Sequence, residues 1–335
     1  MSKCDIGIEL GTTNVKIFVK DKGVVLSTPS VVAIKKETGK LIEIGEKAYK
    51  MIGKTPESII VKHPVSMGVI VDYELNKLML KELLSRVLKK SIKKARVCIC
   101  FHGLMTDVQM RALTETALSS GCGKVFFIEE SVASGLGAGI DILRTNGVMI
   151  VNIGGGTTDI TLLTFNGVIV NRSIKVGGQN IDGIILKNIA SNYNLLIGVN
   201  TAERAKIKIA TVKFPNNSVK YKLSGKDMAT GLPKSIIITQ CDICDKLKEA
   251  IECIIENIKE AVEEAGPEIA ADIYENGILL TGGGSLIDGL PELISEKIGV
   301  KARLADSPTN CVIHGVGKSF DMIDNFNLNF VRAIV

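Results

Sequence analysis

Two short stretches of the chain, about 145 residues apart, repeat one pattern of apolar strand, glycine–threonine turn and second apolar strand. Residues 6–17 read IGIELGTTNVKI, and residues 150–162 read IVNIGGGTTDITL. A further strand is predicted after each, at GVVLSTPSVVAI (23–34) and GVIVNRSI (167–174). The repeat indicates two similar halves, which we expect to face each other.

Helical and strand patterns alternate along the rest of the chain. In the first half the pattern predicts a helix over 75–90, the strand RVCICF (96–101), a helix over 106–120 and the strand KVFFIEE (124–130). In the second half the clearest helix is 242–265, whose apolar residues recur at spacings of three and four before Gly266-Pro267 ends it. These apolar stripes are expected to pack into a core.

Two segments interrupt this alternation, at 31–65 and at 180–240, and are predicted to be insertions. A chain of 335 residues usually divides into about two domains. The pattern therefore predicts an α/β protein of two domains, each carrying a smaller subdomain, with a cleft between them.

Composition narrows the class of protein. Hydrophobic residues make up 46% and charged residues 23%, an ordinary globular balance, and a net charge of +5 gives no global sign of nucleic-acid binding. No secretory signal and no apolar run long enough to span a membrane is recognised, so we expect a cytosolic protein. The only CxxC, Cys241 to Cys244, has no second pair at zinc spacing, and reduced, packed thiols are expected.

Three glycine loops carry the candidate chemistry. Each half contributes a strand–turn–strand loop whose backbone N–H groups and threonine hydroxyls suit an anion, and a third loop follows the apolar run GILL, where a purine or ribose could lie against the backbone. The loops are Gly11-Thr12-Thr13-Asn14, Gly154-Gly155-Gly156-Thr157 and Gly282-Gly283-Gly284-Ser285. One such loop is usually only a turn, but three in this order indicate a polyphosphate clamp for a nucleotide.

Two rival motifs are excluded. Gly315-Val-Gly317-Lys318-Ser319 resembles the end of a P-loop, but position 312 is Val where that motif needs Gly. Gly135-Leu-Gly137-Ala-Gly139 lacks the third glycine at the spacing that a dinucleotide turn requires.

With these loops the chain resembles the superfamily of actin, DnaK-type chaperones and sugar kinases, and more specifically the MreB family. The resemblance runs from about residue 5 to about residue 323 and rests on the three loops together. The stretches that carry it are TPSVVAI (28–34), IGEKAYKMIGKTP (44–56), GVIVDYE (68–74), NYNLLIG (192–198), TGLPK (230–234) and LTGGGSLIDGLPEL (280–293).

The resemblance implies an actin-like, ribonuclease H-like fold of duplicated domains around a nucleotide cleft, with four subdomains. Subdomain IA would comprise 1–30, 66–145 and 313–335, IB 31–65, IIA 146–180 and 245–312, and IIB 181–244. It also implies antiparallel double filaments of the protein itself on the inner membrane surface. These would determine bacterial cell shape, with membrane-anchored cell-shape or wall-synthesis proteins as partners and with ATP and Mg²⁺ as cofactors.

Carried over position by position, the resemblance gives each loop a role. The first two loops would hold phosphates, Gly282, Gly283, Gly284 and Ser285 would hold the adenosine, and Glu203 with Lys206 would hold the ribose and adenine edge. Glu203 and Lys206 stand three residues apart, which places both on one helix face; a plain surface ion pair is the alternative.

The hydrolytic centre departs from the family pattern. Glu9 and Asn152 stand where the family has Asp, so one carboxylate has a longer arm and the other charge is lost. Both would lie near the water shell of Mg²⁺, with no metal ligand from the protein. Glu130 would orient the attacking water and Thr157 would belong to the same centre, while Ser131 replaces the usual Pro. Phosphoryl transfer depends on positioning and electrostatics, so slow ATP hydrolysis is expected.

The membrane contact departs from the family as well. An N-terminal amphipathic helix is not recognised before the first strand, and the equivalent of the family's apolar loop is basic, with Lys89, Lys90, Ile92, Lys93 and Lys94. Either it is a solvated turn, or it is attracted to anionic lipid at about 1 kcal/mol per well-placed Lys or Arg.

Two other functions remain as alternatives. A small-molecule kinase of the same superfamily would need an acid aimed at a sugar hydroxyl and usually a longer chain. A DnaK-type chaperone would need a C-terminal substrate domain, which we do not expect within these residues.

Overall fold

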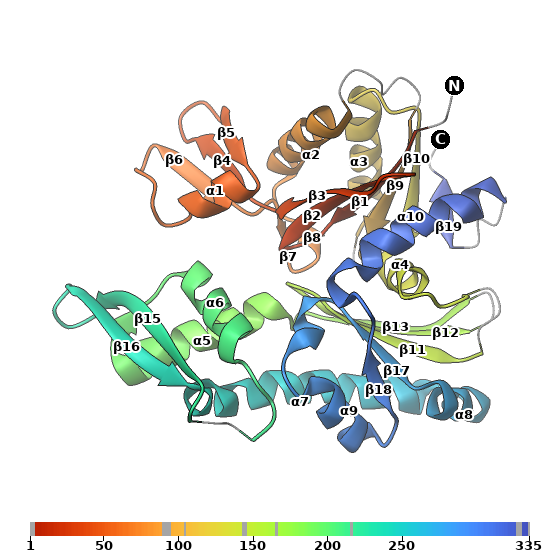
Figure 1. Ribbon diagram of the computed structural model, residues 1–335. Coiled ribbons are helices and arrows are strands. Elements are labelled where there is room, and N and C mark those ends of the chain that lie inside the picture. Colours follow the sequence, from red (N-terminus) through yellow and green to blue (C-terminus); the bar gives the residue numbers. More distant parts are fainter. Residues whose placement is uncertain are drawn as a thin grey trace. The chain divides into compact units, whose positions relative to one another are not determined.

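A computed structural model describes residues 4–88, 95–103, 105–142, 146–164, 167–214, 217–325 and 330–333 (Figure 1). The chain divides into two compact units. Unit 1 comprises Met1–Thr145, Leu163–Gly167 and Thr309–Val335, and unit 2 comprises Asn146–Leu162 and Val168–Pro308. The four subdomain boundaries given above remain a prediction.

Unit 1 is built on a six-stranded mixed sheet in which β1, β9 and β10 run parallel to one another, β2 pairs antiparallel with β1, and β3 pairs antiparallel with β2. In spatial order its strands are β19 (Val331–Ala333), β10 (Lys124–Glu129), β9 (Arg96–Phe101), β1 (Asp5–Leu10), β2 (Asn14–Val19) and β3 (Gly23–Pro29). The predicted strands RVCICF and KVFFIEE are β9 and β10, the second ending one residue earlier.

Helices cover both faces of this sheet (Figure 1). On one face Ile6, Ile8 and Ile99 pack in one core with α2 (Tyr73–Leu88) and α3 (Asp107–Ser119), close to the predicted helices. Side chains alternate along a strand, so Gly7 and Cys98 point to the other face, against α10 (Cys311–Asp324). There a Cβ on Gly7 would meet Val316 Cγ1 at 2.9 Å, and Cys98 Sγ lies 3.3 Å from Ser319 Oγ.

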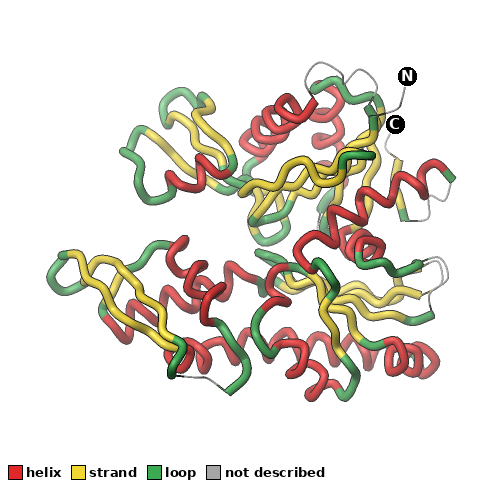
Figure 2. The backbone as a smooth tube through the Cα atoms, in the orientation of Figure 1, coloured by secondary structure: helices red, strands yellow, loops and turns green. Residues whose placement is uncertain are grey.

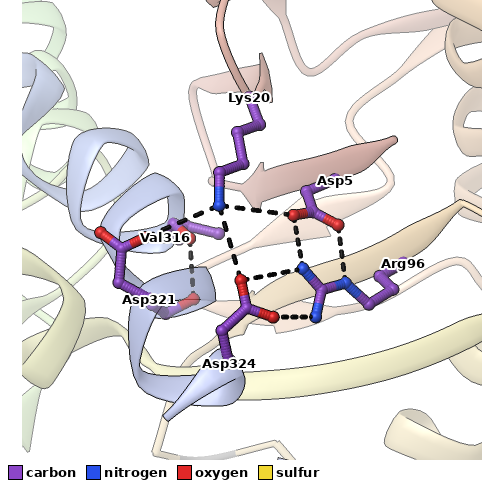
Figure 3. A network of polar contacts seen from close by, with 7 residues as sticks. Asp5, Lys20, Arg96, Val316, Asp321 and Asp324 are labelled. Carbon is purple, nitrogen blue, oxygen red and sulfur yellow. Dashed lines mark hydrogen bonds and ion pairs between the residues drawn. The ribbon is translucent and has the colours of Figure 1, made fainter. Parts of the chain in front are cut away.

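An ion-pair network fastens the end of α10 to the sheet (Figure 3). Arg96 donates to Asp5 from Nε (2.7 Å) and Nη2 (2.6 Å), and to Asp324 from Nη1 (2.5 Å). Lys20 Nζ lies within 3.9 Å of both carboxylates and 3.6 Å from Asp321. The hydrogen bonds that Arg96 donates to Asp5 and Asp324 raise the pKa of Arg96, so this cation stays charged. Arg96, which follows the basic segment in the sequence, is thus buried and paired.

The predicted strand GVVLSTPSVVAI is wrong as one element, because the chain turns in its middle. Its first part is β3, and its last part is β4 (Val32–Lys35) of a separate small sheet. At the break the N–H of Ser30 donates to Thr13 O (2.8 Å) and that of Val31 to Pro29 O (2.9 Å). The small sheet has the order β5-β4-β6, with β5 (Leu41–Ile44), β6 (Ile59–Lys62) and α1 (Glu46–Met51) beside it, and a pair of β7 (Val65–Ser66) and β8 (Val69–Ile70) follows.

Unit 2 repeats the plan with a five-stranded sheet, backed by a core that includes α5 and α7. Its strands in spatial order are β13 (Gly167–Ile174), β12 (Thr158–Thr164), β11 (Val148–Ile153), β17 (Ile278–Thr281) and β18 (Ala302–Leu304). Its helices are α5 (Gly178–Tyr193), α6 (Val199–Ile209), α7 (Gln240–Glu264), α8 (Pro267–Asn276) and α9 (Leu290–Ile298), with 3-10 turns at Gly283–Leu286 and Pro308–Asn310.

The long predicted helix is confirmed as α7, with Gly266 and Pro267 beginning the next helix. A second small sheet of unit 2 has the order β14-β15-β16, made of Leu195–Leu196, Lys220–Asp227 and Pro233–Thr239. Its Leu223 and Ile238 are fully buried, so this sheet packs into the same core as α5 and α7.

The two units share one strand order, since β3-β2-β1-β9-β10 in unit 1 matches β13-β12-β11-β17-β18 in unit 2. Figure 2 colours the strands yellow and the helices red in both units. The duplication expected from the repeated glycine turns is therefore present in the folded chain. Among the described residues, no helix combines the length and apolarity needed to cross a bilayer.

Candidate functional site

The first glycine loop is the turn of the β1–β2 hairpin in unit 1. The N–H of Gly11 donates to Asn14 O (3.0 Å) and closes a turn in which a Cβ on Gly11 would meet that oxygen at 2.8 Å. Thr12 is buried, and its hydroxyl oxygen accepts from the N–H of Gly68 (3.0 Å). The loop is thus held against the β7–β8 turn, where Gly68 has a positive φ of 74°.

At the base of this hairpin Glu9 pairs directly across from Lys16. The Lys16 ammonium lies 3.1 and 3.3 Å from the two Glu9 carboxylate oxygens and also donates to Thr309 O. Glu9 accepts a further bond from the backbone N–H of Ile313, in the first turn of α10. Burial raises the pKa of Glu9, and Lys16 and the Ile313 N–H oppose that rise.

The second loop has the same closure in unit 2. The N–H of Gly154 donates to Thr157 O (2.8 Å), as the N–H of Gly11 does to Asn14 O, so Asn152 and Asp159 hold the positions of Glu9 and Lys16. The start of α5 lies against this loop, with N–H groups of Gly178 and Gln179 donating to Gly154 O (3.0 Å) and Gly155 O (2.7 Å). The positive end of the α5 dipole therefore adjoins the loop and favours an anion there.

The third loop lies directly against the second, at the end of β11. Gly282 has a φ of +81°, and a Cβ there would meet Ile153 O at 2.3 Å and Asn152 Oδ1 at 2.6 Å. Gly284 is as close, with its would-be Cβ 2.3 Å from Ile153 Cγ2. Only glycine fits this approach, because it combines left-handed backbone with contact to another strand. Ser285 is fully buried and donates to Gly282 O (2.6 Å).

Lys206 on α6 reaches the same region of unit 2. Its ammonium lies 2.9 Å from Asp182 Oδ1 and 2.9 Å from Gly178 O, both on α5. Burial raises the pKa of Asp182, Lys206 opposes that rise and nearby Glu203 adds to it. The predicted i, i+3 pair is therefore part of a three-residue cluster beside the second loop, rather than an isolated surface pair.

Glu130 is the first residue of α4 (Glu130–Gly137), directly after β10. The close approach of α4 to α10 positions this helix: a Cβ on Gly137 would meet Cys311 O at 1.7 Å, and one on Gly315 would meet Ala133 O at 1.7 Å. The P-loop-like run at 315–319 thus lies within α10, where Gly315 contacts α4 and Gly317 lies against Phe18 of β2. Ser131, in place of the usual Pro, is buried, and its hydroxyl has no hydrogen-bond partner among the described residues.

Each predicted nucleotide residue therefore lies in a loop or helix of one unit. Unit 1 carries the first loop, Glu9 and Glu130, and unit 2 brings together the second loop, Asn152, the third loop and Lys206. The glycine cradle at Gly282 and the N–H groups of the loops fit a nucleotide. The predicted membrane contacts Lys89, Lys90, Ile92, Lys93 and Lys94 lie outside the described residues.

The contacts of Glu9 do not fit a Mg²⁺ ion whose water shell is held by this carboxylate. Both carboxylate oxygens face the Lys16 ammonium, which repels a second cation at that distance. In the described part of the chain, no three His, Cys, Asp or Glu side chains gather as metal ligands.

Sequence reasoning missed Lys16 and Asp182. Lys16 could have been found by counting: a turn centred between residues 12 and 13 places position 16 opposite position 9. Asp182 gave only the weak signal of a lone acid in a helix rich in apolar residues.

Comparison with known proteins places this geometry in context. The family model described as MreB/Mbl protein matches residues 3–328. The Bacillus subtilis cell shape-determining protein Mbl is 41% identical over 322 residues, covering 96% of each chain. The Escherichia coli cell shape-determining protein MreB is 37% identical over 327 residues, covering 96% of this chain and 94% of its own.

Solved structures agree on the fold. The crystal structure of Spiroplasma citri MreB5 bound to AMPPNP superposes with a TM-score of 0.91 at 35% identity, covering 98% of this chain and 99% of that one. A chain from the structure of a MamK double helical filament superposes with a TM-score of 0.82 at 21% identity, covering 96% of this chain and 99% of that one. The expected actin-like fold is confirmed.

Proposed function

Because this chain belongs to the MreB/Mbl family, we propose that it is an ATP-binding, actin-like protein that forms filaments and helps to determine cell shape. The single observation that carries the proposal is the repeated glycine turn, closed by the same hydrogen bond in both units, with the Gly282 loop against the second copy. Relatives named for cell-shape determination and an MreB5 crystallised with AMPPNP and with ADP support it.

The proposed nucleotide contacts follow from the chemistry of each loop. Backbone N–H groups of Thr12–Asn14 and Gly155–Thr157 donate to phosphate oxygens, aided by the α5 dipole, while those of Gly11 and Gly154 close the two turns. The backbone of Gly282–Gly284 lies flat against the adenosine. Glu203 and Lys206 reach the ribose and adenine edge, and Asp182 holds Lys206 in place. Mg²⁺ accompanies ATP as the solution complex, with no ligand from the protein.

Hydrolysis in this proposal is slow. Glu130 orients the attacking water, and Thr157 is the proposed catalytic residue of the second loop. Asn152 supplies an amide where a carboxylate would favour deprotonation of that water, so the rate falls while the backbone donors that bind ATP remain.

The filament is a homopolymer at the inner face of the cell membrane. Its proposed partners are the anionic lipid surface, through the basic segment at 89–94, and membrane-anchored cell-shape or wall-synthesis proteins. No described feature of the site favours a small-molecule kinase over a filament-forming, ATP-binding protein.

Negative-stain microscopy and sedimentation of the purified chain, with ATP, with ADP and without nucleotide, test the proposal. We expect filaments whose amount depends on the nucleotide. Particles that stay monomeric in all three conditions, at protein concentrations up to tens of micromolar, would refute the filament role.

A further inference from the structure

A buried lysine lies beside the first phosphate loop. Lys16 is only 7% exposed although it carries a full charge, and it stands in β2 two residues after the loop ends at Asn14. Burying an ammonium is costly unless it is paired and hydrogen-bonded. The groups that contact the Lys16 ammonium therefore show which negative charge it compensates.

The Lys16 ammonium is saturated by three acceptor oxygens. Two belong to Glu9, at 3.1 and 3.3 Å, and the third is Thr309 O. An ammonium has three N–H donors, so none is left over for a phosphate in this arrangement. Lys16 therefore acts as the counter-ion of Glu9 rather than as a phosphate ligand.

Glu9 is equally well occupied. Beyond the two contacts to Lys16 it accepts from the N–H of Ile313, which lies in the first turn of α10, where a negative charge is favoured by the helix dipole. The carboxylate thus ties the base of the hairpin to the start of α10. Glu9 and Lys16 together add no net charge to the loop.

We propose that Lys16 takes the place of a divalent cation in neutralising the Glu9 carboxylate at the first loop, so that a nucleoside triphosphate binds nearly as tightly without Mg²⁺ as with it. An unpaired carboxylate here would repel the phosphates unless a metal screened it, because a divalent cation is usually the largest local charge in a phosphate site. The inference rests on the proposed nucleotide binding and adds its metal dependence.

The test is the ratio of two dissociation constants of AMP-PNP, one measured with excess EDTA and one with millimolar Mg²⁺, by calorimetry on the full chain. For the wild type we expect a ratio below about threefold. For Lys16→Met we expect a ratio above about tenfold, caused by weaker binding in EDTA, because the Glu9 carboxylate is then uncompensated.

Two further variants isolate the pair. Glu9→Gln/Lys16→Met removes both charges and should restore the low ratio. Lys20→Met is the matched control. It makes the same charge change at the residue directly after β2, where Lys20 faces Asp5, Asp321 and Asp324, and should keep the wild-type ratio.

The outcomes separate cleanly. A wild-type ratio above about tenfold overturns the inference, even if Lys16→Met fails to fold. Equal losses of affinity in EDTA and Mg²⁺ for Lys16→Met would also overturn it, since Lys16 would then bind the phosphate directly. No binding in either condition would instead remove the nucleotide site itself, and the inference with it.

Discussion

Thr281 donates a hydrogen bond from Oγ1 to Oδ1 of Asn152 over 3.2 Å, between paired positions of the parallel strands β17 and β11. Both residues are buried. The Asn152 amide is therefore anchored at the point where the second and third glycine loops meet. A carboxylate in its place could accept the same bond, so the fold tolerates the change that restores the missing charge.

We predict that Asn152→Asp raises the rate of phosphate release by about tenfold or more, since a placed acid–base group typically contributes about 10²–10⁴-fold. The rate need not reach the usual level of the family, because Glu9 and Ser131 also depart from the pattern. Phosphate release is measured under polymerising conditions, with bound nucleotide and polymer mass determined separately.

Thr281→Val is the control for Asn152→Asp, since it removes the hydroxyl partner without adding a carboxylate, and it should not raise the rate. If the wild type is as fast as Asn152→Asp at equal occupancy and polymer mass, the asparagine is a tolerated replacement and another residue limits the reaction.

Glu130→Ala is predicted to lower hydrolysis by about 10²-fold or more while AMP-PNP affinity stays within about threefold, because Glu130 orients water and does not hold the nucleotide. The neighbouring acid supplies the control: Glu129→Ala makes the same change at the residue that precedes α4 and should keep most of the rate. Equal losses in both variants would mean that the start of α4, not the Glu130 carboxylate, matters.

The Arg96 network predicts a pH dependence of stability. Hydrogen bonding to Arg96 lowers the pKa of Asp324 below its ordinary value of 3.8. A carboxylate whose pKa is lower in the folded than in the unfolded state stabilises the fold at every pH above its pKa in the unfolded state. That stabilisation disappears as the pH falls through its pKa in the folded state. Asp324→Asn should therefore lose about 1 kcal/mol or less near pH 7, since Asp324 is partly exposed, and the difference from wild type should vanish in acid.

Urea unfolding of wild type and Asp324→Asn at several pH values measures this difference. Asp321→Asn serves as the control, because Asp321 is 73% exposed and contacts only Lys20 among the charged groups of Figure 3. A deficit in Asp324→Asn that grows toward acid pH would contradict the assignment.

The basic segment is predicted to govern lipid association. Replacing Lys89, Lys90, Lys93 and Lys94 by Ser should abolish pelleting with anionic liposomes, which in the wild type should weaken with salt because charges at a surface are screened. The control removes four other exposed lysines, Lys220, Lys222, Lys226 and Lys246.

If pelleting survives the loop substitutions, or does not weaken with salt, the segment is a solvated turn. The apolar residues Phe326, Leu328 and Phe330 would then be the next candidates.

The repeated turns and the apolar periodicity predicted the duplicated α/β plan, because period and glycine placement are local properties. The break between β3 and β4 was missed, since Ser30 and Val31 turn through bonds to Thr13 and Pro29 that no periodicity reveals. α10 was not predicted as a helix, because its glycines at 315 and 317 were considered only as a P-loop-like run, and that motif was excluded; in the structure Gly315 allows the contact with α4.

For the candidate site, as for the fold, the local motifs could be predicted from the sequence and the contacts between distant segments could not. The glycine loops and the Glu203–Lys206 spacing were visible along the chain, whereas the partners that set their electrostatics come from distant segments. Asp182 lies 24 positions before Lys206, and Thr309 lies 293 positions after Lys16. Such pairings depend on the fold, which sequence spacing alone does not supply.

The central claim is that the glycine loops bind one nucleoside triphosphate, and calorimetric titration of the full chain with AMP-PNP in millimolar Mg²⁺ tests it most directly. We predict saturable binding with a stoichiometry of one nucleotide per chain, and weaker binding for Lys206→Met, which leaves Asp182 without its cation. The absence of any binding heat at millimolar AMP-PNP, from protein shown to be folded by circular dichroism, would contradict the account.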